Sequence, residues 1–128
     1  MKDRVLIVDD DPFIVKLLEK VMSSNELETV SAGSGQEALD ILAAQSFDVI
    51  LMDLMMPVMG GLEAARQIRA MELPEAKQVP IIPMTAQSSE ESKEGCRAAG
   101  MNSHLTKPIE PDSLVQTILE TTEHAFGK

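Results

Sequence analysis

The stretch Asp48–Gly61, with the sequence DVILMDLMMPVMGG, decides how the rest of the chain is interpreted. Its apolar run over residues 49–52 is bounded by polar and turn residues, which is typical of a strand buried on both faces of a parallel sheet. Asp53 stands where this strand should stop, and a carboxylate there faces the crevice in which open α/β sheets bind ligands. Taken alone, Asp53 fits a simple turn cap equally well, so the choice depends on the other segments.

The composition indicates one globular domain without a membrane span. The 128 residues, 44% of them hydrophobic, are enough to bury roughly two-thirds of the unfolded surface. No run approaches the roughly 20 apolar residues of a membrane span, and three aspartates at 9–11 interrupt the first apolar run where a signal peptide would continue. Cys96 is the only cysteine, so an internal disulfide is excluded. We therefore expect a cytoplasmic location.

The charge balance argues against direct binding to nucleic acid. Lys and Arg total 11 against 21 Asp and Glu, which gives a formal net charge of −10. A chain of this charge is repelled by phosphate backbones. Its three aromatic residues, Phe13, Phe47 and Phe126, also provide no platform for stacking bases.

Five strands and five helices alternate along the chain. Besides residues 49–52, strands are expected over 4–8, 29–32, 79–85 and 104–106. The first helix should run from about Pro12 to Ser23, with Asp11 as its N-cap and an apolar face of Ile14, Leu17, Leu18, Val21 and Met22. The second helix should begin at the capping pattern of Ser34 and Glu37, and the third should follow Gly60–Gly61. The fourth should run from Ser88 or Ser89 to a C′ glycine at Gly100, and the fifth should begin at Pro111.

This alternation predicts an α/β fold, a single doubly wound sandwich over residues 1–128 with no output domain. Residues 72–78 are polar and contain Pro74, so a surface connection is expected there. Pro83 lies inside the fourth predicted strand and cannot donate to a sheet ladder. We therefore expect that strand to be truncated or bulged.

Residues with reactive side chains follow four of the predicted strands, namely Asp9 and Asp10, Asp53, Thr85, and Lys107. The carboxyl ends of parallel strands share one edge, so these side chains should converge. Three carboxylates within about 5 Å would repel by roughly 3 kcal/mol per pair at an effective dielectric near 20, so a cation is needed.

Oxygen ligands indicate Mg²⁺ rather than zinc, because neither His104 nor Cys96 lies beside the acids. Lys107 supplies a point charge and Thr85 a hydroxyl, which are the groups that an incoming phosphoryl group requires. Asp53 would then be the catalytic nucleophile that becomes an aspartyl phosphate. The alternative, acids that cap loops and a solvated lysine, explains each residue singly but not all five at strand ends.

The chain resembles the receiver domain of two-component response regulators over essentially its whole length. The residues that carry the resemblance are Asp9-Asp10 after VLIV, Asp53 in LMDLMMPVMGG, Thr85-Ala86 after PIIPM, and Lys107-Pro108 in HLTKP. The resemblance implies the flavodoxin-like strand order 2-1-3-4-5. The segment GMNSHLTKPI is as similar to receivers of hybrid histidine kinases as to free-standing ones, so both origins stay open.

The resemblance also implies roles for individual residues. Asp53 would accept the phosphoryl group from a histidine kinase or a histidine phosphotransfer protein, which makes the domain a catalyst of its own phosphorylation and dephosphorylation. Asp10, Asp53 and the backbone carbonyl of Met55 would bind Mg²⁺ directly, and Asp9 would act mainly through water. Lys107 would pair with the phosphoryl oxygens, and its bond to the following proline would be cis.

Signalling residues are likewise implied by the family. Thr85 would move toward the phosphoryl group, and partners would recognise the face of the fourth helix, fifth strand and fifth helix. His104 occupies the second switch position, where Tyr or Phe is usual. Met55 and Gln87, two residues past Asp53 and Thr85, would flank the hydrolytic water and tune the phosphoryl lifetime. A monomer or a weak phosphorylation-dependent dimer is expected.

Three other protein classes are alternatives to a phosphorylated receiver domain. A haloacid-dehalogenase-like phosphatase would pair Asp9 with Asp11, but Phe13 stands where its motif has Thr or Val, and Asp53 goes unexplained. An FMN-binding flavodoxin needs a hydroxyl- and glycine-rich phosphate loop where this chain has three aspartates. A receiver-like binding module that is never phosphorylated remains open.

Overall fold

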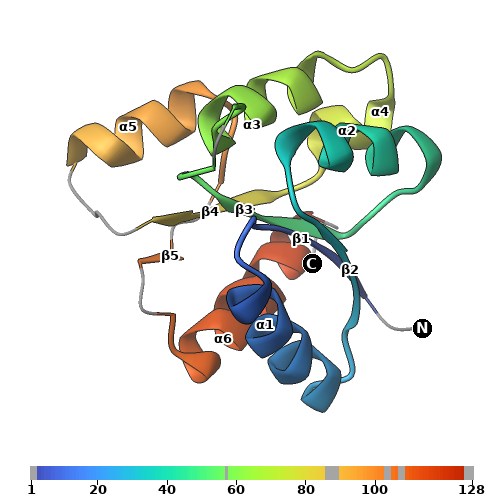
Figure 1. Ribbon diagram of the computed structural model, residues 1–128, viewed down its shortest axis with the longest axis vertical. Coiled ribbons are helices and arrows are strands. Elements are labelled where there is room, and N and C mark those ends of the chain that lie inside the picture. The colour runs from blue at the N-terminus through green and yellow to red at the C-terminus, as the bar shows by residue number, and fades with distance from the viewer. Residues whose placement is uncertain (1–2, 57, 86–89, 103–104, 107–108, 126–128) are drawn as a thin grey trace.

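The computed structural model describes residues 3–56, 58–85, 90–102, 105–106 and 109–125, and these form a five-stranded parallel sheet (Figure 1). The strand order is β2-β1-β3-β4-β5, as the resemblance implied. The strands are β1 (Arg4–Val8), β2 (Glu28–Ala32), β3 (Val49–Asp53), β4 (Ile81–Thr85) and β5 (Leu105–Thr106). Every residue of β3 and β4 is buried, because helices cover both faces of the sheet there.

Helices cover the sheet in two layers, α1 and α6 on one face and α2 to α5 on the other (Figure 1). Their bounds are α1 (Pro12–Ser24), α2 (Gly35–Ala44), α3 (Gly61–Ala70), α4 (Pro74–Gln78), α5 (Glu90–Ala98) and α6 (Pro111–Ala125). Because α4 lies between the third and fourth predicted helices, the fourth and fifth predicted helices correspond to α5 and α6. None of the described helices is long and apolar enough to cross a membrane.

The count of five helices was wrong, because α4 forms where a surface connection was predicted. Pro74 lies in the first turn of α4, where its missing N–H costs no hydrogen bond. Ala76 is buried and joins the apolar cluster that also contains α2, α3 and α5. One buried alanine in five residues gives no helical periodicity, so packing rather than a sequence pattern determines this helix.

The predicted N-caps at Asp11 and Ser34 form, the second with a change in pattern, whereas Ser88 and Ser89, the predicted start of the fourth helix, lie outside the described residues. The Asp11 carboxylate accepts a hydrogen bond from the Phe13 N–H at 2.9 Å. Ser34 Oγ accepts from the Glu37 N–H at 3.1 Å, and the Glu37 carboxylate accepts from the Gly33 N–H at 2.7 Å. The carboxylate thus binds the residue before the N-cap, whereas a standard capping box binds the N-cap itself.

Strand β4 begins at Ile81 rather than at residue 79, and it continues through Pro83 to its end. The backbone N–H and carbonyl of Ile81 both bond to Asn102, on the β5 side, whereas the Met84 carbonyl accepts from the N–H of Leu54, which directly follows β3. Successive residues of a parallel strand bond to opposite neighbours, so the nitrogen of Pro83 also faces the β5 side. Pairing with β5 begins only at Met84, so a proline fits there without breaking the ladder to β3.

Candidate functional site

The carboxyl ends of β1 and β3 bring three acidic side chains together. Carboxylate oxygens of Asp9, Asp10 and Asp53 all lie within 4.8 Å of one another. Asp9 and Asp53 are 2% and 3% exposed, and Asp10 is exposed. The convergence predicted from strand ends is therefore present for these three residues.

Backbone geometry holds the two buried acids in place. The Asp9 carboxylate accepts a hydrogen bond from the Asp11 N–H at 2.9 Å, and the Asp53 carboxylate accepts from the Met55 N–H at 3.2 Å. The loop after Asp53 then folds back on the strand, where a Cβ at Gly61 would collide with the Asp53 carbonyl oxygen and lie 2.7 Å from the Leu54 Cα. Only glycine permits this close approach.

The chemistry of this donor set suits a hard cation. At the observed separation each ionised pair repels by roughly 3 kcal/mol at an effective dielectric near 20, and a divalent ion offsets that repulsion. All three donors are carboxylate oxygens, and among the described residues neither histidine nor cysteine belongs to the group. Oxygen ligands with an exposed side open to water are what Mg²⁺ requires, so the residues fit this ion.

The other predicted site residues are only partly described. Thr85 ends β4 and is 6% exposed, and its partner Thr106 ends β5. Lys107, Pro108, His104 and Gln87 lie outside the described residues, so their predicted roles, and the cis bond, stay predictions. Thr85 and Thr106 do show that both strands end at the same edge of the sheet as β3.

Sequence reasoning missed four exposed apolar side chains that lie near the acids in the sequence and are here called the apolar rim. Phe13, Met55 and Val58 are 85%, 78% and 110% exposed, and Leu17, which was predicted to lie on the buried face of its helix, is 51% exposed. Val58 has a φ of 68°, which is strained for a β-branched residue. The spacing of Phe13 and Leu17 by four residues places them on one face of α1, and only the fold shows that this face is uncovered.

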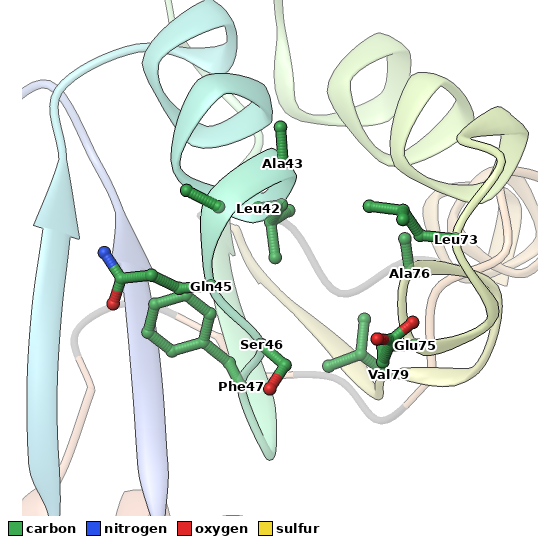
Figure 2. A pocket seen from close by; sticks show the side chains of 10 residues that line it. Leu42, Ala43, Gln45, Ser46, Phe47, Leu73, Glu75, Ala76 and Val79 are labelled. Atoms are coloured by element: carbon green, nitrogen blue, oxygen red, sulfur yellow. The ribbon is translucent and has the colours of Figure 1, made fainter.

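A separate hollow of about 220 Å³ lies between α2 and α4, at the amino ends of β3 and β4. Figure 2 shows Leu42 and Ala43 facing Leu73 and Ala76 across it. Glu75 is the one titratable residue in its lining. A single titratable group among its described lining residues provides no acid–base pair or nucleophile with a base, so the acidic cluster at the opposite edge is the candidate site.

Comparison with solved structures places the fold among receiver domains. Chemotaxis protein CheY4 of Vibrio cholerae superimposes with a TM-score of 0.89 at 32% identity, over 94% of this chain and 99% of that one. The receiver domain of sensor histidine kinase PA1611 of Pseudomonas aeruginosa gives 0.86 at 32% identity, over 95% and 98%. That structure has a magnesium ion coordinated in its active-site cleft.

Curated relatives are longer proteins that share this segment. Sensor protein GacS of Pseudomonas syringae pv. syringae is 35% identical over 120 residues, which are 93% of this chain and 13% of GacS. Transcriptional regulatory protein SrrA of Staphylococcus aureus is 34% identical over 90% of this chain and 46% of SrrA. The family model of the response regulator receiver domain matches residues 5–119. With strand order, acidic cluster and sequence in agreement, the chain belongs to the response regulator receiver domain family of two-component signalling.

Proposed function

We propose that this receiver domain takes a phosphoryl group from a phosphohistidine onto Asp53 in a Mg²⁺-dependent reaction. The observation that carries the proposal is the buried Asp53 carboxylate with Asp9 and Asp10 within 4.8 Å. A carboxylate oxygen attacks phosphorus, the P–N bond of the phosphohistidine breaks, and the imidazole leaves with the electron pair and takes up a proton. The product is an acyl phosphate on Asp53.

Positioning and charge neutralisation are the main requirements of this transfer. Asp10, Asp53 and the Met55 carbonyl would hold Mg²⁺, with Asp9 acting through water, and the ion supplies positive charge against the phosphoryl oxygens. Lys107 would pair with the same oxygens. The buried position of Asp53 excludes bulk water from one side of the carboxylate, which strengthens these charge interactions.

The signal would leave through a different surface. Once Asp53 carries a dianionic group, the Thr85 hydroxyl gains an acceptor and its movement would reposition the loop before α5. Partners would then recognise the face of α5, β5 and α6, with His104 as second switch residue. Hydrolysis would be tuned by Met55 and Gln87, which flank the path of the attacking water. A cytoplasmic location and a monomer or weak dimer remain predictions from the sequence.

The apolar rim formed by Phe13, Leu17, Met55 and Val58 supports a protein as phosphodonor. Phe13 lies three residues past Asp10, and Met55 lies two residues past Asp53, so both residues are close to the acids along the chain. Four of the exposed large apolar side chains thus fall on two segments, α1 and the loop after β3, that each follow an acid of the cluster, and exposed apolar surface of this kind is used for protein contacts. Backbone strain at Val58, which costs on the order of 1–3 kcal/mol, is also typical of functional loops.

Phe13→Ser combined with Leu17→Ser is expected to slow transfer from a phosphorylated histidine phosphotransfer protein by about tenfold or more, because each buried apolar contact is worth about 1 kcal/mol or more. Labelling by acetyl phosphate should be unchanged, since that donor needs no docking surface. Leu119→Ser, on α6 beside Asn25, is the matched control at another exposed leucine. Equal losses with both donors would show that the rim serves the fold or the site itself.

A further inference from the structure

Arg69 joins three segments that lie far apart in the sequence. This residue is in the last turn of α3, and its guanidinium donates four hydrogen bonds. Nε and Nη2 bind the Gly100 carbonyl at 2.9 and 2.7 Å, and Nη1 binds the Ala76 carbonyl at 3.1 Å. Nη2 also binds Asn102 Oδ1 at 3.1 Å. One side chain thus connects α3 to the last turn of α4 and to the end of α5.

The hydrogen-bond acceptors around Arg69 explain why its half-buried position can hold a charged guanidinium. None of these four hydrogen bonds ends on a carboxylate, and burial lowers the pKa of the Arg69 guanidinium. The carbonyls of Ala76 and Gly100 lie at helix C-termini, where unsatisfied carbonyl groups carry negative partial charge. A planar fork of donors satisfies several of them at once, which a lysine cannot do.

Glycine at position 100 allows the close contact with the Arg69 side chain. Its φ of +89° is the left-handed conformation of a residue that ends a helix, and a Cβ there would lie 2.8 Å from the Arg69 Cγ. The Met101 N–H donates to the Cys96 carbonyl at 2.9 Å, which completes the helix stop. The chain therefore leaves α5 at Gly100, and Arg69 holds the carbonyl group of that residue.

Asn102 carries the connection into the sheet. Its N–H donates to the Ile81 carbonyl at 2.7 Å, and its Oδ1 accepts from the Ile81 N–H at 2.8 Å as well as from Arg69. Strand β5 that follows has two residues, Leu105 and Thr106, so its own ladder provides few hydrogen bonds. The hydrogen bonds between Asn102 and Ile81 therefore add an anchor to β4 three residues before β5.

We propose that Arg69 is a positioning residue for phosphoryl transfer, because through Asn102 it determines the register of β5 and so the reach of Lys107. Lys107 follows Thr106 directly in the chain. The inference rests on the proposed function, in which the Lys107 ammonium pairs with the phosphoryl oxygens. A one-residue slip of β5 moves the following residue by about 3.3 Å, and a displacement of about 1 Å in an active site costs as much as 10²-fold in rate.

The positioning role predicts a different combination of phosphorylation rate and Mg²⁺ affinity from the one that general destabilisation of the fold would produce. The acidic cluster lies at the carboxyl ends of β1 and β3, whereas the hydrogen bonds of Arg69 go to α4, the end of α5 and Asn102. Loss of the anchor should therefore slow phosphorylation without weakening Mg²⁺ binding. Asn102 offers a matched pair of variants, because Asp keeps the acceptor oxygen and Ala removes it.

The test compares Asn102→Ala, Asn102→Asp, Arg69→Met and the surface control Arg66→Met, whose one described ion pair is an exposed contact with Glu63. Two quantities are measured for each: the rate constant of phosphorylation by acetyl phosphate at saturating Mg²⁺, and the Mg²⁺ dissociation constant by calorimetry. Asn102→Ala and Arg69→Met should lose about tenfold or more in rate, with Mg²⁺ affinity within about twofold of wild type. Asn102→Asp and Arg66→Met should match wild type in both.

Three results would overturn the positioning role. They are an unchanged rate in Asn102→Ala, an equal rate loss in Asn102→Asp, and a fall in Mg²⁺ affinity that matches the fall in rate. If Arg69→Met does not fold, the two Asn102 variants decide. A wild-type chain that takes up no phosphoryl group contradicts the proposed function and the positioning role together, whereas a labelled wild type with unaffected variants contradicts the positioning role alone.

Discussion

Asp53→Asn is expected to abolish the uptake of a phosphoryl group from acetyl phosphate and Mg²⁺. An amide is neutral and a poor nucleophile at phosphorus, and it removes one of the three carboxylates grouped within 4.8 Å. The variant should still fold, because an amide oxygen can accept the hydrogen bond that the Met55 N–H donates to this side chain. Intact mass before and after incubation measures the effect.

Asp40→Asn is the matched control for this substitution. Asp40 is an exposed aspartate of α2 that accepts a hydrogen bond from Gln36, and it is not one of the three clustered acids. Its asparagine variant should be phosphorylated at the wild-type rate. Undiminished labelling of Asp53→Asn would assign the phosphoryl group to another residue.

Asp10→Ala is expected to raise the melting temperature of the metal-free protein and to blunt its increase on adding Mg²⁺. Removing this carboxylate relieves repulsion against Asp9 and Asp53, and because Asp10 is exposed, solvent screening leaves about 1 kcal/mol of the gain. That corresponds to roughly 3–5 °C. Wild type should gain about 2.7 kcal/mol at a Mg²⁺ concentration 100 times its dissociation constant, and the variant far less.

Asp11→Ala provides the contrast at the next residue. The Asp11 carboxylate caps α1, so its loss should destabilise the protein by about 1 kcal/mol while the response to Mg²⁺ stays intact. Calorimetric scans of both variants with and without Mg²⁺ separate the two effects. A lower metal-free melting temperature in Asp10→Ala with an unchanged Mg²⁺ response would make the cluster a structural feature.

Much of the fold and of the acidic site could be predicted, because short-range patterns determine both. Apolar runs that stop at Asp9 and Asp53 mark two strand ends, and parallel strands must bring those ends to one edge. The cap at Asp11 and the C′ glycine at Gly100 follow from local backbone requirements. The strand order itself came from the family resemblance.

The features that escaped prediction depend on contacts between distant segments. Helix α4 is too short for a periodic pattern, and the tolerance of Pro83 depends on which neighbour its nitrogen faces. The exposure of Leu17 depends on what covers α1. The acceptors of Arg69 are mostly backbone carbonyls, which no residue type marks in the sequence.

The most direct test of the central claim is the intact mass of the wild-type chain after incubation with acetyl phosphate, with Mg²⁺ and with a chelator in its place. The proposal predicts one added phosphoryl group in the Mg²⁺ sample, located on Asp53 by peptide mapping, and none in the chelated sample. A chain that stays unmodified under both conditions would contradict it, and would identify the domain as a receiver-like binding module that signals without phosphorylation.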